Sequence, residues 1–164
     1  MTLKNLNKSL LINISLIFLI FVLDRISKVY VINLSSDYDK LNLKITSFLN
    51  IKLIWNEGIA FGLLSFSEKT YYNMISILIF LIILYILFQC FKDQGISKYF
   101  YVLIAGGAIG NFFDRIVYNS VPDFIDLHYK EFNWFIFNIA DIFISIGIIF
   151  LIMYEIFLSK KSNE

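Results

Sequence analysis

Four long apolar stretches dominate the pattern of hydrophobic and polar positions along the chain. Each approaches the roughly 20 residues that a helix needs to cross a bilayer. The first follows Lys4 and Lys8 but ends at Asp24 and Arg25 without a small-residue cleavage site, so we interpret it as a retained span rather than a secretory signal peptide. The predicted spans are residues 10 to about 30, 71–91, 99 to about 116, and 135–158.

The stretch between the first two spans follows a different pattern, in which apolar and polar residues alternate. The alternation covers residues 41–45 and continues at residues 50–53. A period of two residues is typical of strands that bury one face. The sequence therefore predicts an α-helical membrane protein with four transmembrane helices and a small extracytoplasmic β-sheet between helices 1 and 2. We expect residues 1–164 to form a single integral membrane domain.

The distribution of lysine and arginine predicts how the spans are oriented. The segments on the two sides of the membrane carry equal numbers of basic residues, but the inner segments, such as the one with Lys92 and Lys98, are much shorter. The positive-inside rule gives most weight to short loops near span ends. We therefore expect both termini in the cytoplasm and the sheet on the extracytoplasmic side.

Composition narrows the range of functions. A hydrophobic content of 59% exceeds the roughly 45–50% of soluble domains. The chain has one cysteine, Cys90, and one histidine, His128, so it has neither a disulfide framework nor the ligands of a zinc-protease motif. Its net charge of +1, without a long basic block, gives no indication of a nucleic-acid partner. We therefore expect no cofactor, no metal and no nucleic acid.

Nearly all ionisable residues that enter the predicted spans collect at one depth, near the extracytoplasmic ends. The inner halves consist almost entirely of leucine, isoleucine and phenylalanine. A charged side chain inside a membrane is costly and marks a candidate functional site. The polar residues are Asp24 and Lys28 in the first span, Asn111, Asp114 and Arg115 in the third, Asn138 and Asp141 in the fourth, and Asp123 and Asp126 in the connection before it.

Residue spacing suggests how some of these positions are used. Asp24 and Lys28 are four residues apart and share a helix face. They either form an ion pair whose lysine extends toward the headgroups, or support a polar site from behind. Gly106 and Gly110 form a GxxxG face, which is typical of helices that approach closely in lipid. Gly58, after the predicted sheet, indicates a bend at which backbone can approach a ligand.

The acids beside the fourth span predict a catalytic chemistry. Asn138 and Asp141 are three residues apart and project from the same helix face. The preceding connection can fold over this end, and either Asp123 or Asp126 can supply a second carboxyl. Two carboxyls at hydrogen-bonding distance share one proton. The ionised acid can then take a proton from water while the protonated acid polarises a peptide carbonyl, so the pattern predicts peptide hydrolysis.

Other functions explain the pattern less well. Ser27 and Lys28 are adjacent, so they point about 100° apart on a helix and do not form a serine–lysine pair. A small proton-coupled transporter or channel that used Asp24 and Asp141 should carry polar residues through the full membrane depth. A non-enzymatic scaffold protein explains the GxxxG face but not the acids beside the fourth span.

Five blocks of the chain, in order and over nearly its full length, resemble the lipoprotein signal peptidase family, the type II signal peptidases. The last two blocks match the motifs that carry the catalytic aspartates of the family. The blocks are residues 24–28 (DRISK), 56–61 (NEGIAF), 106–115 (GGAIGNFFDR), 121–124 (VPDF) and 137–141 (FNIAD).

The resemblance implies an intramembrane aspartic endopeptidase with Asp123 and Asp141 as the catalytic pair, and it thus favours Asp123 over Asp126. The implied reaction removes signal peptides from lipid-modified prolipoproteins by cleavage before the diacylglyceryl-cysteine. We expect a monomer in contact with membrane lipid, in the bacterial cytoplasmic (inner) membrane.

The resemblance also implies residues that shape or support the site. Two positions depart from the family pattern: Arg25 stands where glutamine is common, and Pro122 replaces a usual aliphatic residue. Neither change removes a catalytic group. The implied supporting residues are Asp24, Lys28, Asn56, Gly107, Asn111, Arg115, Asn138 and Ala140, to which their positions add Gly58 and Asp114.

Overall fold

The computed structural model describes residues 3–36, 41–58, 69–93, 95–129 and 132–157. Each of its four helices contains a stretch that is long and apolar enough to cross a membrane. Lipid offers the backbone no hydrogen-bond partners, so such stretches are stable there as helices. The predicted transmembrane helices are thereby confirmed. They are α1 (Leu3–Ser36), α2 (Lys69–Lys92), α3 (Ser97–Tyr118) and α4 (Ile139–Phe157).

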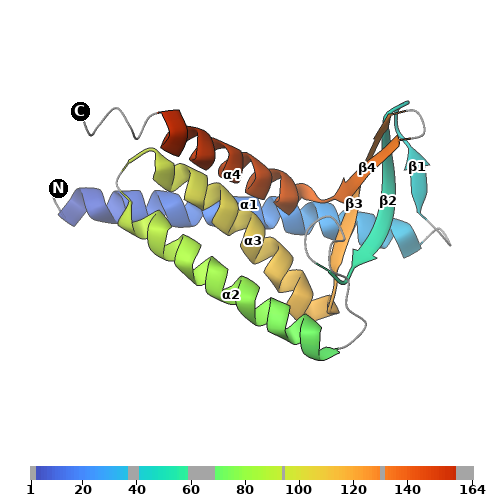
Figure 1. Cartoon of the computed structure of the whole chain (residues 1–164), viewed down its shortest axis with the longest axis horizontal. Helices are drawn as coiled ribbons and strands as arrows, with labels where there is room; N and C mark the ends of the chain where they lie inside the picture. Colours follow the sequence, from blue (N-terminus) through green and yellow to red (C-terminus); the bar gives the residue numbers. More distant parts are fainter. Residues whose placement is uncertain (1–2, 37–40, 59–68, 94, 130–131, 158–164) are drawn as a thin grey trace.

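Helix α3 lies at the centre of the bundle and contacts each of the other three helices (Figure 1). Its glycines allow the close contact with α1. A Cβ atom on Gly106 would lie 2.8 Å from Cβ of Ile20, and one on Gly110 would lie 2.6 Å from Oδ2 of Asp24. Side chains do not tolerate such distances, so only glycine fits at both positions. The helix contact predicted from the GxxxG pattern is confirmed.

A four-stranded antiparallel sheet lies at one end of the bundle, which we call the sheet end (Figure 1). Strands β1 and β2 form the sheet predicted between the first two helices. Strands β3 and β4 come from the connection between α3 and α4, and β3 pairs with β2. The strands are β1 (Asn42–Lys44), β2 (Leu49–Asn56), β3 (Val121–Tyr129) and β4 (Phe132–Phe137).

The start of the fourth span is a correction to the sequence-based expectation. We expected a helix over residues 135–158, but Phe137 and the two residues before it belong to β4, and α4 begins at Ile139. Residue 158 lies outside the described residues. Apolar strand residues and apolar helix residues have the same hydropathy, so the pattern merged the end of β4 with α4. Helix α1 is longer than predicted at both ends.

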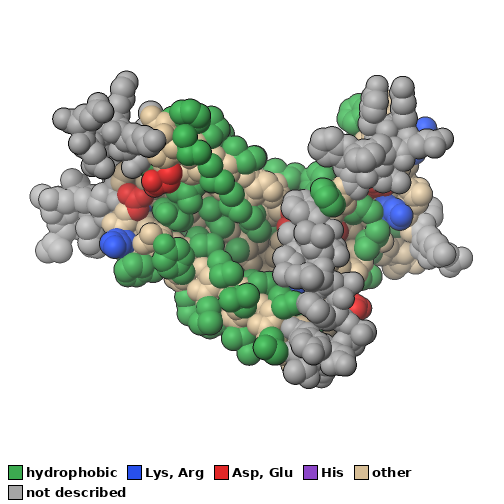
Figure 2. Space-filling model, viewed as in Figure 1, with side chains coloured by type: hydrophobic (Ala, Val, Ile, Leu, Met, Phe, Trp, Pro, Cys, Tyr) green, Lys and Arg blue, Asp and Glu red, His purple; other side chains and the backbone are tan. Residues whose placement is uncertain are grey.

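Apolar contacts fix the position of the sheet on the helices. Val31 of α1, Leu41 before β1 and Phe124 of β3 form a buried cluster. Each of these side chains is about 5% exposed or less. Along the helices, by contrast, hydrophobic side chains cover most of the visible surface (Figure 2). This surface matches the apolar interior of a bilayer, and the buried cluster anchors the sheet to α1.

Candidate active site

Two carboxyls meet in a cavity at the sheet end of the bundle. Asp123 comes from β3, and Asp141 lies in the first turn of α4. Their exposed fractions are 3% and 6%, respectively. The cavity has a volume of about 260 Å³. It is lined by Asn56, Ile79, Ala108, Asn111, Arg115, Val121, Asp123, Asp141, Ile144, Ser145 and Ile148.

Asn138 connects the two carboxyls and caps the N-terminus of α4, which begins at Ile139. Its Oδ1 accepts a hydrogen bond from the backbone N–H of Asp141 at 3.1 Å, and Oδ2 of Asp141 accepts one from the backbone N–H of Asn138 at 3.2 Å. This reciprocal arrangement is a capping box, here built from asparagine and aspartate. The Nδ2 group of Asn138 also donates to Oδ1 of Asp123 at 2.6 Å. One capping residue therefore holds both acids.

Two further asparagines hold the remaining oxygens of the acids. Nδ2 of Asn56 donates to Oδ2 of Asp123 at 2.9 Å. Nδ2 of Asn111 donates to Oδ1 of Asp141 at 2.8 Å. Oδ1 of Asn56 in turn accepts the backbone N–H of Gly58 at 2.9 Å, a turn that fixes the asparagine. Both carboxyls are thus oriented by amide groups from three different parts of the chain.

The surroundings of Asp123 favour its protonated form. Burial, together with the negative charge of Asp141, raises the pKa of the Asp123 carboxyl to about 7. Hydrogen bonds from Asn56 and Asn138, together with the charge of Lys28, act in the opposite direction. Near neutral pH, a large fraction of the molecules therefore carries a proton on Asp123. Such a pair can hold one ionised and one protonated carboxyl at the same time.

Lys28 lies behind the carboxyl pair and is fully buried. Its Nζ donates to Oδ2 of Asp24 at 2.9 Å, to Oδ1 of Asn111 at 2.7 Å and to Oδ2 of Asp114 at 2.7 Å. The lysine does not extend toward the headgroups, so the ion pair supports the site from behind. Oδ1 of Asp24 accepts the backbone N–H of Ala140 at 3.1 Å, which ties α1 to the first turn of α4.

Gly107 allows α3 to approach α4 beside the carboxyl pair. A Cβ atom at this position would lie 2.5 Å from the carbonyl oxygen of Ala140 and 2.8 Å from Cγ1 of Ile144. Ala140 itself is fully buried. Gly107 and Ala140 therefore allow α3 and α4 to pack closely, and this close packing brings Asn111 within hydrogen-bonding distance of Asp141.

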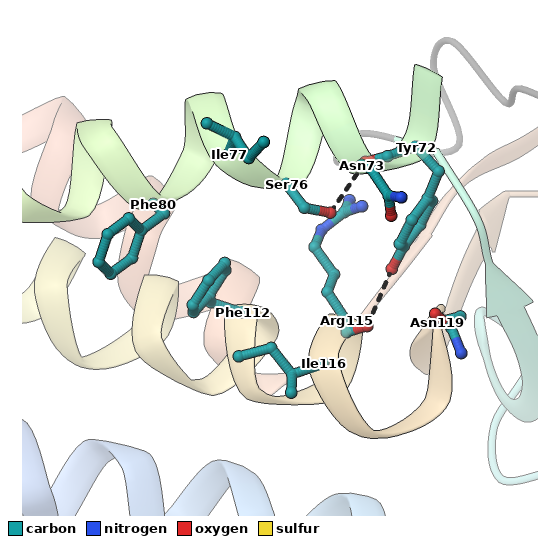
Figure 3. A pocket seen from close by; sticks show the side chains of 9 residues that line it. All are labelled: Tyr72, Asn73, Ser76, Ile77, Phe80, Phe112, Arg115, Ile116 and Asn119. Carbon is teal, nitrogen blue, oxygen red and sulfur yellow. Dashed lines mark hydrogen bonds between the residues drawn. The ribbon is translucent and has the colours of Figure 1, made fainter. Parts of the chain in front are cut away.

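Arg115 lines both the carboxyl cavity and a second cavity of about 500 Å³, whose lining residues come from α2 and α3 and from Asn119 (Figure 3). Its Nη2 donates to the carbonyl oxygen of Gly58, and its Cζ lies 5.4 Å from the ring centroid of Tyr72. The second cavity is larger, but the described residues that line it include no carboxylate. They are Tyr72, Asn73, Ser76, Ile77, Phe80, Phe112, Arg115, Ile116 and Asn119.

The structure distinguishes Asp123 from Asp126, the two acids between which residue spacing could not decide. Asp126 pairs in register with Asn50 of β2 and Ile136 of β4, and it does not line the carboxyl cavity. Asp123 does line it, opposite Asp141. Residues 59–61 of the block at 56–61 lie outside the described residues.

Two residues near the site were not predicted to belong to it. Arg25 binds both carboxylates beside Lys28, and Ser145 lines the carboxyl cavity. Ser145 follows Asp141 by four residues, so helical spacing already placed it on the same face. Arg25 stood out only as a departure from the family pattern, since its neighbour on the first span, Asp24, already had a predicted partner in Lys28.

Comparison with known proteins identifies the family. A family model described as "Signal peptidase (SPase) II" matches residues 16–157. The chain belongs to the signal peptidase II family. It is therefore a membrane peptidase of the signal peptidase II type, and the resemblance seen in the five sequence blocks is confirmed.

Relatives in the signal peptidase II family match most of the chain. The lipoprotein signal peptidase of Pelagibacter ubique (strain HTCC1062) is 52% identical, over 96% of this chain and 95% of the relative. That of Rickettsia prowazekii (strain Madrid E) is 38% identical, over 91% of this chain and 77% of the relative. That of Francisella tularensis subsp. mediasiatica (strain FSC147) is 38% identical, over 74% and 78%.

Solved structures support the same fold for this signal peptidase II. One bacterial membrane enzyme, solved at 2.3 Å, has a TM-score of 0.72 and 29% identity, with 93% of this chain and 90% of that chain covered. A second, solved at 1.9 Å, has a TM-score of 0.70 and 28% identity, with 89% and 92% covered. The arrangement of four helices and a sheet is therefore that of a bacterial membrane enzyme.

Proposed function

We propose that this signal peptidase II removes signal peptides from lipid-modified prolipoproteins by cleaving before the diacylglyceryl-cysteine, with Asp123 and Asp141 as its catalytic pair. The observation that carries the proposal is the pair itself: two buried carboxyls in one cavity, both held by Asn138. The family membership of the chain supports the substrate class. A proton-coupled transporter is not favoured, since the family is one of peptidases.

The chemistry follows from one proton shared by the two acids. The protonated carboxyl donates a hydrogen bond to the oxygen of the scissile carbonyl, while the ionised carboxyl takes a proton from a water molecule. The water oxygen attacks the carbonyl carbon while the protonated carboxyl transfers its proton to the carbonyl oxygen, which gives a tetrahedral diol. Collapse of the diol breaks the C–N bond, and a carboxyl gives its proton to the leaving nitrogen. No covalent bond to the enzyme is needed.

The supporting residues prepare this geometry before substrate binds. Asn56, Asn111 and Asn138 fix the carboxyl oxygens, and Gly107 and Ala140 keep the helices close enough for these contacts. Such preorganisation avoids a reorientation of dipoles during the reaction, which is a large part of enzymatic rate enhancement. The buried cluster around Lys28 then holds the first turn of α4 in place.

The position of the site suits a substrate that is itself embedded in lipid. A signal peptide is an apolar helix, and the lipid on its cysteine places the scissile bond near the headgroups. The carboxyl pair lies at the sheet end, whereas α1 begins and α4 ends at the opposite end (Figure 1). We place the sheet end on the extracytoplasmic side of the bacterial cytoplasmic membrane, with a monomeric, single-domain enzyme and both termini cytoplasmic.

Processing of a precursor in cells tests this function. The chain is expressed in bacteria depleted of their own signal peptidase II, and a lipoprotein precursor is followed by its change in mobility on gels. We expect processing of the normal precursor and none of a variant precursor whose lipid-bearing cysteine is replaced by alanine. Equal cleavage of both precursors would rule out recognition of the lipid-modified cysteine.

The reaction should depend on pH through the proton shared by the acids. Asp123 loses its proton as the pH rises through about 7, and the pair then lacks its hydrogen-bond donor. We therefore expect the initial rate of the purified enzyme in micelles to fall above this pH. A rate that continues to rise well beyond neutral pH would show that a single ionised carboxyl suffices. The folded state of the enzyme is checked at each pH by fluorescence.

A further inference from the structure

Four charged side chains form a buried cluster between α1 and α3, which we call the charged cluster: Asp24, Arg25, Lys28 and Asp114. Asp24, Lys28 and Asp114 are fully buried, and the Arg25 side chain is 14% exposed. Two negative and two positive charges give a net charge of zero. Burial makes this balance important, because an uncompensated charge in a low-dielectric interior acts strongly on its neighbours.

Arg25 supplies the second positive charge through three hydrogen bonds. Its Nη1 and Nη2 bind the two oxygens of Asp114, with Nη2 at 2.7 Å from Oδ2. Nη2 also donates to Oδ2 of Asp24 at 2.9 Å. A bidentate pair of this kind is among the strong, directional contacts of proteins. Without Arg25, two carboxylates would share the single charge of Lys28.

Arg25 packs against two aromatic rings and does not line the carboxyl cavity. Its Cζ is 5.0 Å from the ring centroid of Phe113 and 5.9 Å from that of Phe21. It lines neither the carboxyl cavity nor the cavity between α2 and α3. An effect of Arg25 on catalysis must therefore pass through the charged cluster rather than through contact with a substrate in these cavities.

Two hydrogen-bonded connections join the charged cluster to the first turn of α4. Lys28 donates to Oδ1 of Asn111 at 2.7 Å, and Nδ2 of Asn111 donates to Asp141 at 2.8 Å. Asp24 accepts the backbone N–H of Ala140 at 3.1 Å. A change in the charge or geometry of the charged cluster therefore reaches Asp141 through Asn111 and through the backbone of Ala140.

We propose that Arg25 is a positioning residue that sets the pH range of the carboxyl pair by keeping the charged cluster neutral. This inference rests on the proposed function of Asp123 and Asp141. A neutral side chain at position 25 leaves a net charge of −1 behind the pair, which favours the protonated form of a nearby carboxyl. The other charged groups near the pair are Asp24 and Lys28 from α1 and Asp114 and Arg115 from α3. Tyr72 of α2 lies against Arg115, and β3 also carries Asp126, outside the cavity lining.

A charge-balanced set of variants tests the inference. Arg25→Gln gives the cluster a net charge of −1, Asp114→Asn gives +1, and the double variant restores zero. We expect the pH profile of kcat/KM to move up for Arg25→Gln and down for Asp114→Asn, each by on the order of one pH unit. The double variant should return to within about 0.3 unit of wild type. Arg25→Lys, which keeps the charge, should leave the profile in place.

Opposite shifts that cancel distinguish electrostatics from damage to the fold, because two structural defects would add rather than cancel. An unchanged pH profile in Arg25→Gln would overturn the inference and leave Arg25 as a purely structural ion pair. Shifts in the same direction for both single variants would overturn it as well. Failure of the proposed function looks different: Asp123→Asn or Asp141→Asn would then still process the precursor.

Discussion

Replacing either Asp123 or Asp141 by asparagine is expected to lower the rate of signal-peptide removal by roughly 10²- to 10⁴-fold, the range for loss of a general acid or base. Asparagine has nearly the same shape as aspartate but neither ionises nor donates a carboxyl proton. The pair would lose either the group that activates water or the one that polarises the carbonyl. Initial rates of precursor cleavage by purified enzyme in micelles measure the effect.

Asp126→Asn is the matched control for these variants. Asp126 lies on the same strand as Asp123 and is also buried, with 8% exposed, but it does not line the carboxyl cavity. We expect this variant to retain the rate of wild type to within about threefold. Membrane insertion and thermal unfolding are compared for all three variants. Full processing by Asp123→Asn or Asp141→Asn, in folded protein, would remove that residue from the catalytic pair.

Lys28→Met is expected to lower the free energy of unfolding by about 3–5 kcal/mol, the usual cost of breaking a buried ion pair from one side. Methionine fills most of the space of the lysine but satisfies none of its three acceptors. Asp24 and Asp114 would then share only the charge of Arg25. Asn111 would also lose its donor, so activity should fall together with stability. Chemical denaturation in mild detergent measures the change.

Lys52→Met is the control for Lys28→Met. Lys52 is exposed on β2 and forms no ion pair in the described part of the chain. Its replacement should change stability by less than about 0.5 kcal/mol. A loss below about 1 kcal/mol for Lys28→Met would be typical of a surface ion pair. Such a result would mean that water reaches the ammonium group of Lys28 and that the charged cluster is not closed.

The helices could be predicted from the sequence because the bilayer leaves a long apolar run few alternatives. The spans over residues 71–91 and 99–116 agree with α2 and α3 to within a few residues. The GxxxG contact was also predictable, since Gly106 and Gly110 leave a groove on one face of a helix. Both features are local and depend on residues close together in the chain.

Strands β3 and β4 escaped prediction because their patterns are interrupted. The pairing of β2 with β3 shifts register between Ile51 and Ile54, and that of β3 with β4 shifts between Asp126 and His128. A bulge adds a residue and breaks the period of two on which strand prediction depends. The extra residues lie on β2 and β4 rather than on β3. Within β3, Asp123 and Asp126 are three residues apart, a spacing typical of one face of a helix rather than one face of a strand.

The site was only partly predictable because it depends on contacts between distant segments. Local spacing placed Asn138 near Asp141, although the capping box puts Asn138 before α4 rather than within it. The choice between Asp123 and Asp126 depended on the family resemblance. The contact of Arg25 with Asp114 joins two helices, and neither residue carries a pattern that indicates the other.

The pairing of β2 with β3 has a consequence for biosynthesis. β2 precedes α2 and β3 follows α3, so the middle of the sheet closes only after the second half of the chain has emerged from the ribosome. Asn56 of β2 is synthesised before Asp123 of β3, to which its Nδ2 donates a hydrogen bond in the folded protein. Both proposed catalytic acids also lie in this second half, so we expect the nascent chain to be inactive until β3 and α4 have been synthesised.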